Sequence, residues 1–140
     1  MLLTGKYEHQ IDAKNRIRIP TKLKGNEDKV YFSKGTDGCI FVLFEDYVQE
    51  KVAILNNVRI NDRDGQRGVR AFTNSLTPVE ADTQGRLVIP SELITYANIK
   101  KDVTICGSGS RIEVWAKEVY EKYVAESQGF DEDISYLDMI

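Results

Sequence analysis

Histidine and cysteine are both scarce in this chain of 140 residues, and this limits the chemistry that its side chains can perform. His9 is the single histidine, and the two cysteines, Cys39 and Cys106, form no Cys-x-x-Cys pair. A structural zinc site usually needs four cysteine or histidine ligands, and a Cys–His catalytic pair needs a histidine beside a reactive thiol. The sequence therefore predicts no metal site and no cofactor. Each cysteine lies in an apolar run typical of a strand, so we expect two buried free thiols.

Long hydrophobic runs and catalytic motifs are missing as well. No apolar run approaches the roughly 20 residues that a membrane span needs. The start, MLLTGKYEHQ, lacks the basic and apolar regions of a secretory signal, so a cytoplasmic location without membrane contact is expected. The sequence contains no glycine-rich phosphate loop and no nucleophile–base set. We therefore expect no enzymatic activity and no small-molecule substrate.

Charge is distributed unevenly along the chain. The formal net charge is −3, which by itself argues weakly against a nucleic-acid partner. Residues 1–24, however, hold six lysines and arginines against two acidic residues. Residues 126–140 hold five acidic residues and no basic one. Because a binding partner responds to the local field more than to the total charge, the N-terminal segment remains a candidate site for nucleic acid.

The sequence does contain one short motif twice. IDAKNRIRIP occupies residues 11–20, and ADTQGRLVIP occupies residues 81–90. A second pair of related blocks covers residues 35–52 and 107–124. The chain therefore reads as an internal duplication, and two copies predict a pseudo-symmetric pair rather than an extended repeat array. The identical positions of the first pair are Asp12/Asp82, Arg16/Arg86, Ile19/Ile89, Pro20/Pro90 and Leu23/Leu93.

Each half has the pattern of a hairpin, a short helix, a second hairpin and a longer helix. Alternating apolar and polar residues around each motif predict strands that bury Ile17, Ile19, Leu87 and Ile89. Asn15 and Gly85 lie in the turns and tolerate a positive φ. The predicted helices cover residues 21–25 and 45–55 in the first half and 91–97 and 117–127 in the second. The remaining predicted strands cover residues 30–34, 39–44, 103–106 and 111–116.

The spacing of the motif places an aspartate and an arginine on opposite sides of a turn. Asp12 and Arg16 are close enough to pair there, and so are Asp82 and Arg86. One interpretation is a surface ion pair that stabilises the turn and contributes little else. The other is an arginine held in a fixed orientation, ready for a planar acceptor that takes two hydrogen bonds. The occurrence of arginine in both copies favours the second interpretation, because lysine would serve a turn equally well.

The two motifs carry a family resemblance. DAKNRIRIP and DTQGRLVIP resemble the Asp-x-x-x-Arg motif of the AbrB/MazE/SpoVT-type swapped-hairpin DNA-binding fold. Two copies in a chain of this length resemble the bacterial MraZ family, as do GKYEHQIDAKNR, KGTDGCIFV, RAFTNSLTPVEADTQGR and GSGSRIEVWAKEVYEKY. The resemblance covers about residues 1–125, and it departs from the usual family pattern at Gly65 and Gly68 of the connecting segment.

The resemblance implies an α+β fold: a pseudo-twofold, double-repeat swapped-hairpin β-barrel of the SpoVT-AbrB type, flanked by short helices. The first repeat would span residues 1–54 and the second residues 77–125, joined by a helical segment at 55–76. Beyond the resemblance, the acidic composition of residues 126–140 predicts a mobile segment, which could compete with DNA for the basic face.

The resemblance also implies a function. The chain would be a sequence-specific regulator, expected to be a repressor, that binds double-stranded DNA at G-rich direct repeats in the promoter of the division and cell-wall gene cluster. It would form a ring-like homo-oligomer and associate with the nucleoid. The alternative is an antitoxin-like protein-interaction module of the MazE type.

Roles follow for the motif residues. Arg16 and Arg86 would read guanine, whose O6 and N7 accept two hydrogen bonds from one guanidinium. Lys14 and Arg18 would contact DNA phosphates and fix the register. Asp12 and Asp82 would orient the two arginines. Because the second copy has Gln84 and Val88 in place of Lys14 and Arg18, the N-terminal half should supply most of the electrostatic affinity.

Three further groups have less certain roles. Arg59, Arg63, Arg67 and Arg70 have the spacing of one helix face, which could contact DNA phosphates, pair with acidic residues of a neighbouring subunit, or be solvated. Trp115, Tyr120 and Tyr123 predict an aromatic cluster for core packing or a subunit interface. Lys6, Lys22 and Lys24 are more distant candidates for DNA contacts, and the solvated surface is the favoured interpretation for them.

Overall fold

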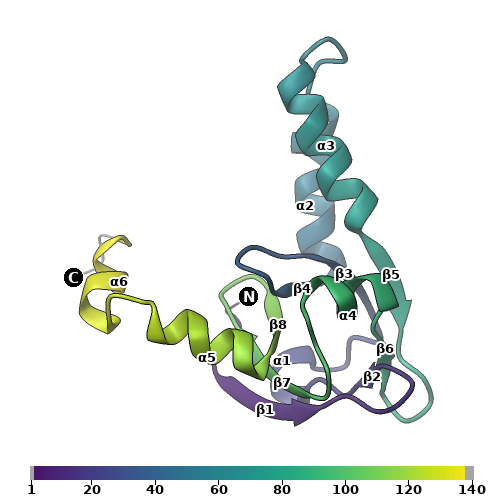
Figure 1. The fold of residues 1–140 in the computed structure, drawn as a ribbon. Coiled ribbons are helices and arrows are strands. Elements are labelled where there is room, and N and C mark those ends of the chain that lie inside the picture. Colours follow the sequence, from purple (N-terminus) through teal and green to yellow (C-terminus); the bar gives the residue numbers. More distant parts are fainter. Residues whose placement is uncertain (1, 138–140) are drawn as a thin grey trace.

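Strands from the two halves of the chain share one antiparallel sheet, which forms the centre of the fold (Figure 1). The structure, a computed structural model, describes residues 2–137. Its strands are β1 (Lys6–Gln10), β2 (Arg16–Ile17), β3 (Lys29–Lys34), β4 (Ile40–Leu43), β5 (Thr77–Glu80), β6 (Leu87–Val88), β7 (Asp102–Gly107) and β8 (Ile112–Ala116). Six of them form a sheet in the order β1-β7-β8-β4-β3-β5, and β2 pairs with β6 in a separate two-stranded sheet.

The order of the strands reflects the duplication of the sequence. If each strand is exchanged for its counterpart in the other half, β1 for β5, β3 for β7 and β4 for β8, the same order is read backwards. Among the described residues, the β1–β7, β3–β5, β4–β8 and β2–β6 ladders all join the two halves. Only β3–β4 and β7–β8 pair within one half. Each half therefore depends on the other for most of its backbone pairing, and the two fold as one unit.

Proline separates each motif strand from the short helix that follows it. Pro20 and Pro90 lack the N–H that a ladder bond would need, so no motif strand continues past them; β2 and β6 end earlier, at Ile17 and Val88. The carbonyl oxygen of Pro20 accepts from the N–H groups of Leu23 and Lys24 at 2.9 and 3.0 Å, which starts a helical turn. The helices are α1 (Thr21–Lys24), α2 (Glu45–Asn56), α3 (Arg63–Ser75), α4 (Ser91–Tyr96), α5 (Lys117–Ala125) and α6 (Phe130–Ser135). Their positions confirm the four helices predicted within the halves, and α3 lies in the connecting segment that was expected to be helical, whereas α6 was not predicted. No helix among residues 2–137 combines the length and apolar character required to traverse a bilayer.

The core confirms the predicted inward faces of the motifs. Ile17, Ile19, Leu87 and Ile89 are each no more than 1% exposed and belong to one apolar cluster. Cys39 and Cys106 are buried free thiols, as predicted. Burial raises the pKa of the Cys39 thiol to about 12, so this thiol stays protonated at neutral pH.

The first hairpins and the closed barrel differ from expectation. Turns do form at residues 12–15 and 82–85, with a positive φ at Asn15 (59°) and Gly85 (77°). The strands that flank each turn nevertheless pair with the other half of the chain, as β1 does with β7. No ladder among residues 2–137 joins the edge strands β1 and β5, so the main sheet stays open. The physical reason is that the chain leaves this sheet after each edge strand to build the separate β2–β6 ladder, which has two residues per strand.

Lys24 is also placed differently from the prediction. We expected it on the solvated surface, but it is only 7% exposed. Its ammonium donates to the carbonyl oxygen of Glu27 and lies 3.8 Å from Asp28 Oδ1. These local partners hold the charge beside α1, so Lys24 serves the fold and is not free to meet a ligand.

The connecting segment forms a projecting arm, which we define as residues 45–75. Helices α2 and α3 both contact β3 and are joined by residues 57–62, and Figure 1 shows them extending away from the sheet. The Asp62 carboxylate accepts from the N–H of Gly65 at 3.0 Å and caps α3. Because the cap starts the helix at Arg63, Arg59 lies in the preceding loop, and the predicted arginine stripe is shortened to Arg63, Arg67 and Arg70.

The two glycines of α3 predict opposite effects on stability. A Cβ at Gly68 would meet no atom within 4 Å, whereas one at Gly65 would lie 2.4 Å from the Asp62 carboxylate. We expect Gly68→Ala to stabilise the protein by about 0.5–1 kcal/mol, because alanine loses less backbone entropy in a helix. Gly65→Ala should be destabilising because it displaces the cap. Urea denaturation of both variants measures the difference, and a loss of stability in Gly68→Ala would contradict the prediction.

The C-terminal part of the chain forms a second projection, which we call the tail and define as residues 117–137. Helix α5 contacts β7 and β8 at its base, and α6 follows it (Figure 1). The ring of Trp115 lies 5.4 Å from that of Tyr120 and 5.0 Å from that of Tyr123, which confirms the predicted aromatic cluster. The acidic segment expected to be mobile includes α6, and its residues 138–140 lie outside the described part of the chain. Its mobility and the proposed domain boundaries stay predictions.

Candidate functional site

The two motif turns have almost the same geometry. Asp12 Oδ2 accepts from Arg16 Nε at 2.6 Å, and Asp82 Oδ2 accepts from Arg86 Nε at 2.8 Å. The other carboxylate oxygen of Asp12 accepts two backbone N–H groups, those of Lys14 and Arg16, at 2.9 Å each. Asp82 makes the equivalent pair of bonds in the second copy. The predicted pairing across each turn is therefore confirmed, and the carboxylate fixes the backbone and the guanidinium together.

The hydrogen bonds of each turn favour the charged carboxylate. The backbone N–H of Arg16 is the main cause that lowers the pKa of Asp12, with further lowering by the guanidinium of Arg16 and the N–H of Lys14. The pKa of Asp82 is lowered in the same way by Arg86 and Gln84. The stabilisation of the turns is therefore present above the ordinary aspartate pKa and is lost as the pH falls through the lowered value. Both aspartates are charged and orient their arginines at neutral pH.

Each motif arginine keeps part of its hydrogen-bonding capacity free. The carboxylate holds Nε, and no hydrogen bond within residues 2–137 involves Nη1 or Nη2 of Arg16 or Arg86. The side chains are 25% and 27% exposed. A guanidinium with one edge fixed and two terminal nitrogens available can donate two parallel hydrogen bonds to a planar acceptor.

The β2–β6 ladder brings the two motifs together. Arg16 faces Val88 across the ladder, and Ile17 faces Leu87. The N–H of Ile89 also donates to the carbonyl oxygen of Asn15 at 2.8 Å. Arg16 and Arg86 therefore flank one central pair of buried residues, as a pseudo-symmetric pair of motifs requires.

Both arginines line the same basic depression. This open hollow of about 520 Å³ is bordered by residues of β1, both motifs and the start of β7. Its charged lining comprises Arg16, Arg18, Arg86 and Lys101 against Asp12, so the hollow is strongly positive. Arg18 and Lys14 are exposed, but Lys14 lies on the turn and does not line the hollow. The structure therefore places four of the predicted residues around one surface and Lys14 and Asp82 beside it.

Lys101, His9 and Gln10 were missed by the sequence analysis. They line the hollow because β1 pairs with β7, and the N–H of Ile11 donates to the carbonyl oxygen of Lys101 at 2.9 Å. Only the pairing of β1 with the opposite half brings Lys101 to the first motif. The equivalent residue of the first half is Asp28, whose carbonyl oxygen accepts from the N–H of Ala81 at 2.7 Å, so the duplication offered no signal for a lysine at this place.

The second copy of the motif lacks an equivalent concentration of positive charge. Glu80 and Val88 take the places that Gln10 and Arg18 have in the first copy. The surface around the two arginines is therefore strongly basic on one side and nearly neutral on the other. The larger electrostatic role of the N-terminal half stays a prediction.

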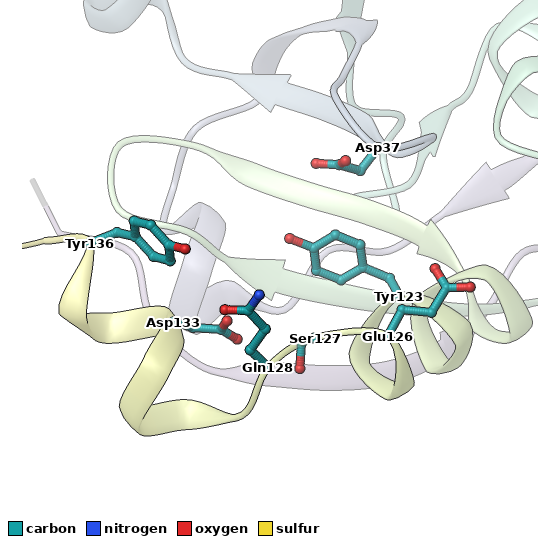
Figure 2. A pocket seen from close by; sticks show the side chains of 7 residues that line it. All are labelled: Asp37, Tyr123, Glu126, Ser127, Gln128, Asp133 and Tyr136. Carbon is teal, nitrogen blue, oxygen red and sulfur yellow. The ribbon is translucent and has the colours of Figure 1, made fainter.

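Other hollows in the described residues have a different character. The hollow in Figure 2 measures about 550 Å³ and is lined by the carboxylates of Asp37, Glu126 and Asp133 together with Tyr123 and Tyr136. Its charge disfavours any anion. No group of three or more histidine, cysteine or carboxylate side chains within residues 2–137 is placed to hold a metal ion. The basic depression is therefore the hollow best suited to a polyanion.

Known proteins are similar to this chain over both motifs. A family model described as "MraZ protein, putative antitoxin-like" matches residues 74–135. A protein of Thermoanaerobacter pseudethanolicus named "Transcriptional regulator MraZ" is 37% identical over 139 residues, which cover 98% of this chain and 97% of that protein. Proteins of the same name from Acetivibrio thermocellus and Ureaplasma parvum are 37% and 35% identical over 132 and 137 residues. These alignments cover 94% and 96% of this chain and 92% and 94% of those proteins.

Proposed function

Since the chain belongs to the MraZ family, we propose that it is a transcriptional regulator that binds double-stranded DNA at specific sequences. The observation that carries the proposal is the pair of aspartate-oriented arginines that share one basic depression. The free terminal nitrogens of these two guanidinium groups lie on one surface, where they can donate hydrogen bonds to the edges of DNA bases. No catalytic set is part of this proposal, and the protein acts by binding alone.

Base reading is assigned to Arg16 and Arg86. Each terminal pair of nitrogens would donate to O6 and N7 of a guanine in the major groove, where this acceptor pair distinguishes guanine from the other bases. Asp12 and Asp82 hold the side chains so that less conformational freedom is lost on binding. The preference should therefore be for G-rich sites.

Backbone contacts are assigned to Lys14, Arg18 and Lys101. Lys14 and Arg18 are exposed beside Arg16, and Lys101 closes the basic depression from the second half. Phosphate contacts of this kind fix the register of a protein on the duplex and carry no sequence information. Because they lie on one side only, each subunit should bind in one orientation, which suits direct repeats better than palindromes.

The finer parts of the proposal rest on the family. We place the target in the promoter of the division and cell-wall gene cluster, with repression as the effect and the cytoplasmic nucleoid as the location. The exchange of strands between the halves supports a swapped-hairpin arrangement of the SpoVT-AbrB type. A ring-like homo-oligomer would then present several basic depressions to successive repeats.

An antitoxin-like role is the second candidate. The matching family model carries that word in its description, and the tail exposes apolar side chains such as Phe130 and Tyr136 that could cover a partner protein. Co-purification of a small basic protein that the tail is required to hold would favour this role. Specific DNA binding by the isolated chain would favour the regulator.

The salt dependence of DNA binding tests the regulator. The logarithm of the affinity for a G-rich duplex should fall linearly with the logarithm of the salt concentration, by about 0.9 for each neutralised phosphate. Arg18→Ala should reduce the slope by about one per subunit bound. Lys122→Ala removes an exposed charge on α5 and should leave the slope unchanged. Equal affinity for a G-rich and a shuffled duplex in anisotropy titrations would contradict sequence-specific binding.

A further inference from the structure

The arm and the tail carry most of the large apolar side chains that the protein exposes. On the arm, Ile54 is 61% and Ile60 is 90% exposed. On the tail, Phe130 is 73%, Tyr136 is 77% and Leu137 is 62% exposed. Exposed apolar side chains that gather on projecting elements indicate surfaces that other proteins cover.

The exposed face of α3 is basic. Arg63, Arg67, Arg70 and Asn74 recur at intervals of four, three and four residues, so they lie along one side of the helix. All four are exposed, and the stripe ends in a hollow of about 300 Å³ whose charged lining is Lys34 and Arg70 against Glu92. The ion pair between Arg67 and Asp64, at 3.4 Å, is fully solvated and can be exchanged for another partner at little cost.

The tail has the opposite charge. Asp131, Glu132 and Asp133 follow one another on α6, and the hollow of Figure 2 adds Glu126 and Asp37. The figure shows the hydroxyl groups of two tyrosines, Tyr123 and Tyr136, facing that hollow. No basic residue lines it. Carboxylates beside tyrosine rings suit guanidinium groups, which form ion pairs with the acids and stack on the rings.

We propose that the tail of one copy of this chain binds the α3 face of the arm of a second copy. The charges of the two surfaces are complementary, and both the arm and the tail expose large apolar side chains. Figure 1 shows the arm and the tail extending from the body in different directions, so one copy uses the two surfaces toward two different neighbours. The arginines of the arm enter the acidic hollow, and the apolar side chains of both elements become covered.

A contact of this type has a geometric consequence. The two surfaces are different, so the contact is head-to-tail, and repetition closes into a ring or continues as a filament. The inference rests on the homo-oligomer of the proposed function and names the surfaces that build it. It leaves the basic depression, which contains Arg16 and Arg86, outside the contact and open to DNA.

Charge reversal in the full-length protein tests the contact. One variant carries Arg63→Glu, Arg67→Glu and Arg70→Glu, and the other carries Asp131→Lys, Glu132→Lys and Asp133→Lys. Each alone should weaken self-association at least tenfold, measured as a drop in mass by sedimentation velocity. An equimolar mixture should regain the mass of the wild type, because a reversed arm fits a reversed tail and a native tail fits a native arm.

A third triple variant is the matched control. Lys14→Glu, Arg18→Glu and Lys101→Glu reverse as many charges on the DNA side and should abolish DNA binding without changing the mass. If the arm triple fails to fold, which circular dichroism shows, the single changes Arg70→Glu and Asp133→Lys give the same comparison.

The outcomes separate this inference from the proposed function. An oligomeric wild type whose mass is unchanged by both reversals, or is not restored by the mixture, overturns the arm–tail contact alone. A monomeric wild type overturns the contact together with the proposed ring. Loss of specific DNA binding is measured separately and concerns the basic depression.

Discussion

Arg16→Ala should lower the affinity of each subunit for its G-rich repeat by about 5-fold to 150-fold. A bidentate contact to guanine discriminates by about 1–3 kcal/mol, and a factor of ten corresponds to about 1.4 kcal/mol. The loss should fall mainly on the specific complex, so that the affinities for G-rich and shuffled duplexes converge. Anisotropy titrations of both duplexes at one salt concentration measure the effect.

Arg16→Lys separates the shape of the side chain from its charge. The ammonium of lysine keeps the positive charge but cannot donate the two parallel hydrogen bonds of a guanidinium. We expect this variant to retain binding to shuffled DNA and to lose most of the preference for G-rich DNA. Lys122→Ala is the control for the removal of one charge. If Arg16→Ala still binds the G-rich duplex at the wild-type concentration, Arg16 does not read bases.

The local parts of the site could be predicted because short-range rules determine them. The four-residue spacing of Asp12 and Arg16 around a turn fixes their pairing, and alternation fixes Ile17 as buried. No motif strand continues past its proline, because proline lacks an N–H. Duplication supplied the symmetry, since two equivalent motifs most simply pair with each other, as β2 and β6 do.

The long-range parts could not be read from the same patterns. Alternation shows that residues 6–10 form a strand but does not identify its partner, and the partner β7 lies more than 90 residues away. Lys101 could therefore be assigned to the site only after the pairing of β1 with β7 was known. Lys24 shows the same limit, because its burial depends on the carbonyl oxygen of Glu27 and the carboxylate of Asp28 after the chain turns.

The asymmetry between the halves connects the fold to the proposed mode of binding. Strand exchange makes the backbone nearly twofold, whereas the side chains differ, because Val88 and Glu80 stand in the second copy where the first has Arg18 and Gln10. A symmetric surface would bind a duplex equally well in two orientations. Because the positive charge lies on one side of the surface, one of the two orientations is favoured. A subunit bound to one repeat therefore defines a direction along the DNA. Several subunits can then follow direct repeats in register.

A duplex with three tandem repeats should bind about 10²-fold to 10⁴-fold more tightly than a duplex with one repeat. After the first subunit of an oligomer binds, the next contacts are intramolecular and benefit from a high effective concentration. Ten additional base pairs between repeats preserve the rotational phase, whereas five rotate the next repeat by about half a turn of the duplex. The five-pair insertion should therefore remove most of the gain, and the ten-pair insertion should remove less. The arm-reversal variant, which should not assemble, supplies the control. For this variant, the affinity for three repeats should exceed the affinity for one repeat only by about the number of repeats. Equal affinities of the wild-type protein for one and three repeats would show that the subunits bind independently, and the assembly would then have no part in recognition.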